Sequence, residues 1–428
     1  MRRRLFARAA CVLVVLFLAR RGEAEELTID RAVGVALQQN RDVIAARLEI
    51  EASQIDRIAA GLYWNPVFSY GVGDIVIPNG NPQPPADLRP GPFSQLVHSI
   101  GVSEVVDVWA KRSARVRAAD LGIEHRRLLV EDALRDIVFT VRGAFTDLVR
   151  DQAEYALSAT MKARYDETIR LSRARAAAGE ISEAELRKIE LEGLKYQNAL
   201  IDAELELRLG RQRLVALMGL PADAELAGPA TAVDPPRVPP QYAALYARAL
   251  ETRPDVRAAR KGLSLADAQI DAAQREAYPD ISVGASYTHS EFTVSGDNPN
   301  TAGVSLSLPL PLFDRNQAVV ARSRLERKRS DNELARLTLV VGHEVAEAVR
   351  RVERSGTLLD VYEGGMLSRA DAALRVAESS YKAGAISLLE LLEAQRTFID
   401  TRADYLRVQD DYRKAQIAVI HAVGERRP

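Results

Sequence analysis

The feature that most constrains this 428-residue chain is that several short stretches of its first half recur, in the same order, in its second half. The stretch 36–47 recurs at 249–260, and both copies contain Asp-Val-x-Ala-Ala-Arg. Ala-Gly-Glu-Ile-Ser at 178–182 recurs as Ala-Gly-Ala-Ile-Ser at 383–387. Internal similarity of this kind predicts structural repeats. We expect a first repeat at 25–220 and a second at 241–428, joined by a Pro-rich linker at 221–240 that cannot be helical throughout.

The first 24 residues are typical of a secretory signal peptide. Three arginines at 2–4 precede an apolar run at 11–19, and small residues at 22 and 24 suit cleavage before Glu25. An N-terminal membrane anchor is the alternative, but the run is far shorter than the roughly 20 residues that span a bilayer. The only cysteine, Cys11, lies within the run, so we expect no lipid anchor there. Its removal with the signal excludes disulfides and thiol chemistry from the mature chain.

The composition favours long helices. Aromatic residues make up only 6% of the chain, while 47% is apolar and 27% is charged; this balance is typical of helical and coiled-coil proteins and excludes a disordered chain. The formal net charge is −1 and no basic stripe appears, so nucleic acid is not predicted as a partner.

Two proline-free stretches, 114–177 and 317–382, each predict one helix of about 65 residues, or about 100 Å at the rise of an α-helix. A shorter helix should precede the strands in each half, and another should follow the turn at 178–182 or 383–387. The helices after the turns carry heptads of apolar and small residues. These heptad positions are Leu186, Ile189, Gly193, Tyr196, Leu200, Ala203, Leu207, Gly210, Leu214 and Leu217 in the first copy, and Leu391, Ala394, Phe398, Thr401, Tyr405, Val408, Tyr412, Ala415, Val419 and Ala422 in the second.

Two strands are expected between the helices of each half, at 67–76 and 100–108 and at 281–288 and 304–310, with loops at 78–92 and 295–301. Apolar residues alternate with small or polar ones along these strands, which predicts one apolar face. The pattern also fits a half-buried sheet in a soluble domain. Strands of about ten residues can cross a bilayer at a barrel tilt, but four strands cannot close a barrel. A membrane barrel would need several chains: two would supply eight strands and three would supply twelve.

Enzymatic activity is not predicted. The Gly-Val-Gly at 71–73 lacks the rest of a dinucleotide fingerprint, and no catalytic triad pattern is present. The five histidines are scattered without metal-ligand spacing, so neither a metal site nor a cofactor is predicted.

The chain resembles the TolC family of outer-membrane efflux proteins over its whole mature length. The resemblance is carried by the duplicated order of helices and strands, by the two Ala-Gly-x-Ile-Ser turns, and by Leu-Pro-Leu-Pro-Leu-Phe-Asp-Arg-Asn-Gln at 308–317. That last segment is similar to the metal-resistance branch, the outer-membrane subunits of cobalt, zinc, cadmium and copper exporters. Multidrug channels of the family carry looser versions of it.

The resemblance implies an α+β membrane protein that forms a homotrimer. A 12-stranded barrel in outer-membrane lipid, four strands from each chain, would continue as a long helical tunnel through the periplasm. The two turns would form the periplasmic tips, which meet a periplasmic adaptor (membrane fusion) protein and, through it, a proton-driven inner-membrane RND pump. The adaptor-contact positions carried over are Gly179, Ile181, Ser182, Gly384, Ile386 and Ser387, and the residues carried over to the periplasmic aperture are Glu390 and Glu393.

Glu390 and Glu393 also attract attention without the resemblance, because they lie three residues apart on one helical face just after a turn. A solvated acidic pair at a helix start is the plain alternative, since the helix dipole favours anions there. In a trimer they would favour cations in the pore. Ile386 occupies the place of the family's partner arginine, so a closed state held by ion pairs at that point is not expected. An exported coiled-coil stalk remains the alternative from another class, and a single-chain porin is disfavoured by the long helices.

Overall fold

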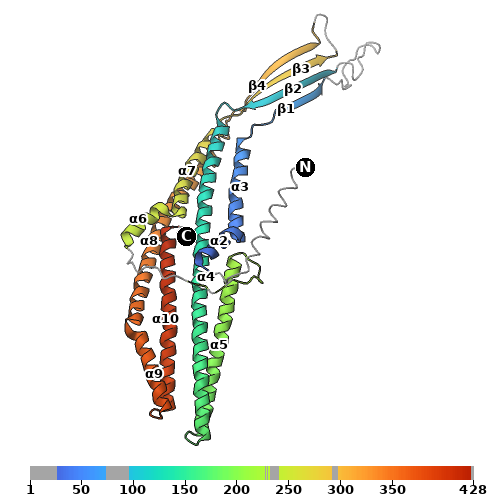
Figure 1. Ribbon diagram of the computed structural model, residues 1–428. Helices are drawn as coiled ribbons and strands as arrows, with labels where there is room; N and C mark the ends of the chain where they lie inside the picture. The colour runs from blue at the N-terminus through green and yellow to red at the C-terminus, as the bar shows by residue number, and fades with distance from the viewer. Residues whose placement is uncertain are drawn as a thin grey trace. The chain divides into compact units, whose positions relative to one another are not determined.

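A computed structural model describes residues 27–73, 96–226, 228, 230–231, 241–291 and 297–425 (Figure 1). The expected signal peptide at 1–24, the loop at 78–92 and most of the Pro-rich linker lie outside the described residues. The chain divides into two compact units. The first contains Met1–Ala46, Glu131–Arg253 and Leu339–Pro428, and the second contains Arg47–Val130 and Pro254–Thr338.

The same kinds of element follow one another in both halves of the chain. The first half contains α2 (Ile29–Gln39), α3 (Arg41–Gly61), β1 (Val67–Gly73), β2 (Val97–Val106), α4 (Lys111–Ala177) and α5 (Glu183–Leu217). The second contains α6 (Tyr242–Thr252), α7 (Pro254–Arg275), β3 (Ile281–Ser290), β4 (Asn300–Ser307), α8 (Gln317–Val361), a π-helical segment η2 (Tyr362–Met366), α9 (Leu367–Lys382) and α10 (Leu388–Val423).

The expectation of one helix before the strands of each half is wrong, because two helices stand there. Asn40 separates α2 from α3 with an extended backbone, and its Oδ1 accepts a hydrogen bond from the Asp42 N–H at 2.8 Å. Arg253 separates α6 from α7; it is also extended and precedes Pro254, which disfavours a helical conformation at the residue before it. The side chains of both break residues donate to the end of a later helix: Asn40 Nδ2 to the Leu217 carbonyl at 2.8 Å, and Arg253 Nη1 to the Ala422 carbonyl at 3.1 Å.

The two long helical stretches differ. The first prediction is confirmed, since α4 is one helix of 67 residues. The second is wrong, because the stretch from Gln317 to Lys382 is interrupted by η2, where Gly365 has a φ of +137°, outside the helical range. Adjacent glycines at 364 and 365 allow this conformation, and no residue of η2 is buried, so packing does not impose a regular helix there.

The four strands form one antiparallel sheet in the order β1-β2-β3-β4. Its register puts Tyr70, Ile100 and Tyr287 in one row across three strands, and Ser69, Gly101 and Ser286 in the next. The predicted alternation is therefore confirmed: one face is mostly apolar and the other carries small and polar side chains. Among the described residues, β1 and β4 each pair on one side only.

The last strand lies earlier in the sequence than predicted. It covers Asn300–Ser307 instead of 304–310, because Asn300 pairs with His289 in the sheet register and Pro309 and Pro311 cannot continue a ladder. The segment 308–317 therefore forms the connection from β4 to α8. Asn316 ends it with a φ of +58° and donates from its side chain to the Ala273 carbonyl at 2.8 Å.

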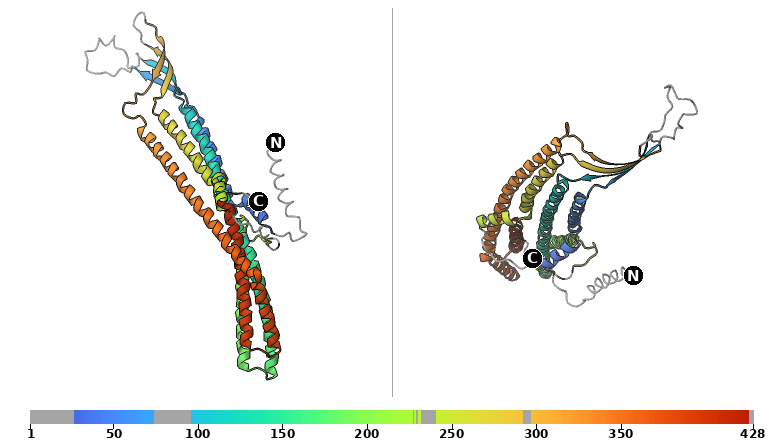
Figure 2. Two further views of the ribbon diagram at one scale, coloured as in Figure 1. Left: turned by 90° about the vertical axis from the view of Figure 1, so that its left-hand side faces the viewer. Right: turned by 90° about the horizontal axis from the view of Figure 1, so that it is seen from above.

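In the first unit, α5 lies beside α4 and α10 lies beside α9, as Figure 1 shows; the left view of Figure 2 shows the α9–α10 pair in front. Many of the predicted heptad positions are buried in these pairs, which supports the predicted register. They are Ile189, Gly193, Gly210 and Leu214 in α5, and Leu391, Phe398, Thr401, Tyr412, Ala415 and Ala422 in α10.

Candidate functional site

The candidate site consists of the two turns, 178–182 and 383–387, which have the same geometry. Gly179 and Gly384 adopt left-handed conformations, with φ of +77° and +73°, immediately after their helices. The next residue closes each turn by donating to a carbonyl five residues back: Glu180 to Arg175 at 2.9 Å, and Ala385 to Ser380 at 2.8 Å. This closure is a Schellman motif, which explains why each turn has glycine at that position.

A serine starts the helix after each turn. Ser182 Oγ accepts a hydrogen bond from the Glu185 N–H at 3.1 Å, and Ser387 Oγ accepts one from the Glu390 N–H at 3.4 Å. At the second turn the Glu390 carboxylate also accepts from the Ser387 N–H at 2.7 Å, which completes a capping box. The glycines and serines named from the sequence thus have a structural role in forming the turns, and both serines are exposed.

One core cluster brings the two turns together. Ile181 of the first turn and Ile386 of the second pack against the same buried residues. This cluster, the turn cluster, consists of Tyr165, Ile189, Tyr381, Leu388 and Leu391. Burial of the Tyr165 ring raises the pKa of its hydroxyl. Both turns lie in the first unit, so the structure places the six predicted tip residues in one region.

Arg175 connects the first turn to the second. Its Nε lies 3.0 Å from Glu180 Oε2 within the first turn, and its Nη1 donates to the Tyr381 carbonyl at 3.3 Å. The guanidinium carbon lies 5.2 Å from the centre of the Tyr381 ring, and the Tyr381 hydroxyl is 3.2 Å from Ser172 Oγ. This contact is not predictable from the sequence, because nothing in the pattern around Arg175 distinguishes it from the other arginines of α4.

The predicted aperture residues differ from each other in their surroundings. Both carboxylates are exposed. Glu390 is engaged in the capping box, and its hydrogen bonds from the Ser387 backbone and hydroxyl lower the pKa of its carboxyl group. No hydrogen bond or ion pair of Glu393 is found among the described residues. The plain alternative, an acidic residue that stabilises a helix start, therefore accounts for Glu390 within one chain, and Glu393 is the better candidate for a pore-facing charge.

A groove beside the turn cluster carries charges of both signs. It encloses about 510 Å³ between α4 and the α9–α10 pair. Arg164 of α4 and Glu378 of α9 form an ion pair across it at 3.3 Å. Its other charged lining residues are Glu167, Arg375 and Lys382. A groove of this composition suits a polar protein surface better than an apolar ligand.

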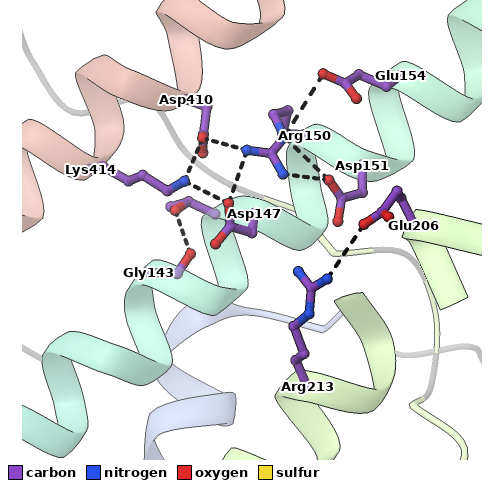
Figure 3. A network of polar contacts seen from close by, with 10 residues as sticks. Gly143, Asp147, Arg150, Asp151, Glu154, Glu206, Arg213, Asp410 and Lys414 are labelled. Carbon is purple, nitrogen blue, oxygen red and sulfur yellow. Dashed lines mark hydrogen bonds and ion pairs between the residues drawn. The ribbon is translucent and has the colours of Figure 1, made fainter. Parts of the chain in front are cut away.

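A partly buried ionic network joins α4 to α10 further from the turns (Figure 3). Arg150 of α4 lies 2.8 Å from Asp151 Oδ1 and 3.2 Å from Asp410 Oδ2 of α10. Lys414 Nζ lies 2.7 Å from the same Asp410 oxygen and 2.6 Å from Asp147 Oδ1. The Asp151 and Asp410 side chains are only 2% and 4% exposed, and burial raises the pKa of Asp151.

Among the helices of the described residues, none combines the length and the apolar character needed to cross a membrane. Nowhere in the described part of the chain do three or more His, Cys, Asp or Glu side chains gather in a way that could hold a metal ion.

Two paired helical turns, long helices and a four-stranded sheet define the class of the outer-membrane efflux channels. The model of the family described as "Outer membrane efflux protein" matches residues 32–220 and 245–425, and the chain belongs to that family. It is therefore an outer-membrane protein of a Gram-negative cell, and it belongs to a family of efflux channels, not of enzymes.

Among curated proteins, the chain is similar to the cobalt-zinc-cadmium resistance protein CzcC of Cupriavidus metallidurans, at 26% identity over 94% of this chain and 91% of CzcC. It is also similar to the pyoverdine export outer membrane protein OpmQ of Pseudomonas putida, at 22% identity over 92% of this chain and 85% of OpmQ. Among solved structures, that of CusC has the same fold, with a TM-score of 0.75 and 16% identity over 94% of this chain and 92% of CusC.

Proposed function

We propose that this chain is the outer-membrane channel subunit of a tripartite efflux system that exports heavy-metal cations. The observation that carries the proposal is the similarity to the metal-resistance protein CzcC, which covers nearly the whole of both chains. The segment 308–317, at the connection from β4 to α8, supports the same branch of the family. The metal ion is cargo here, so the channel itself needs no metal site.

The proposed assembly contains three chains whose sheets join into a 12-stranded barrel, with the helices forming a periplasmic tunnel. The four-stranded sheet supports this, because among the described residues each of its outer strands pairs on one side only, and lipid cannot satisfy the groups of the other edge. Its apolar face supports it too: Phe68 is 66% exposed and Val304 86% exposed in the single chain. Such a face is stable against lipid but costly in water.

The proposed periplasmic tips are the two turns, with Gly179, Ile181, Ser182, Gly384, Ile386 and Ser387 at the contact with an adaptor protein that connects to a proton-driven RND pump. The shared turn cluster and the charged groove beside it support a docking role. Glu390 and Glu393 are proposed to line the aperture. The equal order of elements in the two halves supports the division into repeats at 25–220 and 241–428 with the linker 221–240 between them.

A second candidate cargo is an organic compound, as in a multidrug channel. The similarity to OpmQ, which is named for pyoverdine export, supports it. Membership of an efflux family argues against the exported stalk.

Growth of a deletion strain, with and without a plasmid that carries the gene, distinguishes the two cargoes. We expect the deletion to sensitise cells to salts of zinc, cobalt, cadmium or copper, and the plasmid to restore growth, while tolerance of lipophilic drugs stays unchanged. If the deletion strain is sensitive to drugs alone, and the plasmid restores its growth, the proposed cargo would be an organic compound instead of a metal. Equal growth of all strains under every compound would contradict an efflux function.

A further inference from the structure

A row of apolar side chains on α5 faces away from the rest of its chain. Leu191, Leu194, Ile201 and Leu205 are 53–61% exposed, whereas Ile189 and Leu214 of the same helix are buried. Together with the exposed Asn198 they follow a spacing of three and four residues in alternation, which places all five on one side of the helix. We name this row the α5 stripe: Leu191, Leu194, Asn198, Ile201 and Leu205.

The α5 stripe has the pattern of a coiled-coil seam. Apolar residues at alternating spacings of three and four meet a second helix in such seams. A single Asn within the seam lowers stability but fixes the register and the number of helices. Exposing four large apolar side chains in a row to water is unfavourable, so the stripe predicts a helical partner.

A second exposed row lies on α9 and the last residue of η2. Met366 is 42% and Val376 is 64% exposed, and Arg369 and Ala372 between them are also exposed. Apart from the one arginine, the row is apolar or small, which leaves room for the larger side chains of another helix. We name it the α9 stripe: Met366, Arg369, Ala372 and Val376.

The two stripes match in position when distances are measured from the turns, which share one core cluster. Along α5, Leu191, Leu194 and Asn198 lie about 12, 16 and 22 Å from the start of the helix at Glu183. Along α9, which runs toward its turn, Val376, Ala372 and Arg369 lie about 9, 15 and 20 Å from its end at Lys382.

Four of the five residues of the α5 stripe therefore have a counterpart at nearly the same height. Ile201, at about 27 Å, also meets Met366 at about 24 Å. Asn198, the one amide of the α5 stripe, lies at nearly the same height as Arg369, the one charged residue of the α9 stripe. An arginine donates readily to an amide oxygen, so the polar position is matched by a polar position and the apolar ones by apolar ones.

We propose that the α5 stripe of one copy packs antiparallel against the α9 stripe of the next copy, with Asn198 accepting from Arg369. The inference rests on the proposed assembly of several chains and adds the surfaces that hold it together. Two different surfaces meet in this contact, so each copy offers its α5 stripe to one neighbour and its α9 stripe to the other. Contacts of this kind can close into a ring. Pairing of the α5 stripe with its own copy would instead stop at two chains.

Cysteine cross-linking in the full-length chain tests the pairing, and Cys11→Ser removes the only native thiol from every variant. We expect Leu194→Cys with Ala372→Cys, oxidised in isolated outer membranes, to give covalent dimers and trimers on a denaturing gel. Each single variant should remain a monomer. Lys188→Cys with Arg375→Cys is the matched control, since these exposed positions lie at nearly the same height on the same helices but outside the stripes; it should not cross-link.

Three results would overturn the pairing. Dimers from Leu194→Cys alone would show that α5 meets its own copy. A product formed only when an adaptor is present, with the adaptor's mass added, would assign the stripe to the adaptor. If the double variant gives no cross-link but the protein in detergent has the mass of three chains, these surfaces are rejected and the assembly is kept. If the protein has the mass of one chain, the assembly itself is rejected.

A second variant pair gives a readout without cysteines. Leu194→Glu with Ile201→Glu should reduce the assembled fraction at least tenfold, because two charges would be buried between helices. The helical circular dichroism should stay unchanged, since both side chains are exposed in the single chain. Assembly at the native level would contradict the proposal.

Discussion

Gly219→Ala is expected to lower the free energy of unfolding by about 4 kcal/mol, through strain and overpacking together. Gly219 ends α5 with a φ of +73°, a conformation that costs energy for any residue with a Cβ. The added Cβ would also lie 2.5 Å from the Gln39 carbonyl oxygen and 2.8 Å from the Asn40 Cα. Both are backbone atoms at the break between α2 and α3, so neither can move without displacing a helix.

Gly179→Ala is the control for this prediction. Gly179 has nearly the same φ, +77°, but a Cβ there would meet no atom within 4 Å. Only the backbone strain remains, so we expect the free energy of unfolding to fall by about 1 kcal/mol. Thermal unfolding of both variants, followed by circular dichroism in detergent, measures the difference. Equal destabilisation by the two substitutions would show that α5 does not pack closely on the break at Asn40.

Asp410→Ala is expected to destabilise the first unit by about 3 kcal/mol, near the lower limit for breaking a buried ion pair. Asp410 is the shared partner of Arg150 and Lys414, and its removal leaves both cations with the carboxylates of α4 alone. We choose the lower limit because the Arg150 and Lys414 side chains are 26% and 35% exposed, so that water compensates part of the loss.

Asp404→Ala provides a matched control on the same helix. Asp404 pairs with Arg407 at 3.1 Å, but these side chains are 51% and 66% exposed, and such pairs contribute at most about 1 kcal/mol. Unfolding by urea would measure both variants. A loss at Asp410 as small as that at Asp404 would mean that the network does not fasten α4 to α10.

The sequence predicted the elements that depend on periodicity. The heptads of α5 and α10 and the alternation in the strands follow from the regular spacing of apolar residues, and the structure contains them. The unbroken α4 follows from the absence of proline between 114 and 177. The turns were predictable because a Schellman turn requires glycine after the helix, and a serine cap favours the start of the next one.

The differences between prediction and structure occur where a single residue determines the backbone conformation. At Asn40 no proline marks the break, and one of the side-chain hydrogen bonds that stabilise it is accepted by Leu217, far away in the sequence. Gly365 could equally have continued the helix, because glycines at 122, 143, 193 and 210 lie within helices. The Arg175 contact with Tyr381 and the ionic network depend on which helices become neighbours, and a sequence pattern does not give that.

The central claim is that several copies of the chain form a cation-preferring channel. The most direct test is to measure the conductance of the purified full-length chain in planar lipid bilayers. We predict stable single-channel conductance from a species whose mass in detergent equals three chains, with cations preferred over anions. The preference should fall in Glu390→Gln with Glu393→Gln and should persist in the control Glu185→Gln, which replaces an acidic residue of the first helical turn of α5. A protein that leaves the membrane in urea as a single chain and gives no conductance above that of the bare bilayer would contradict the account.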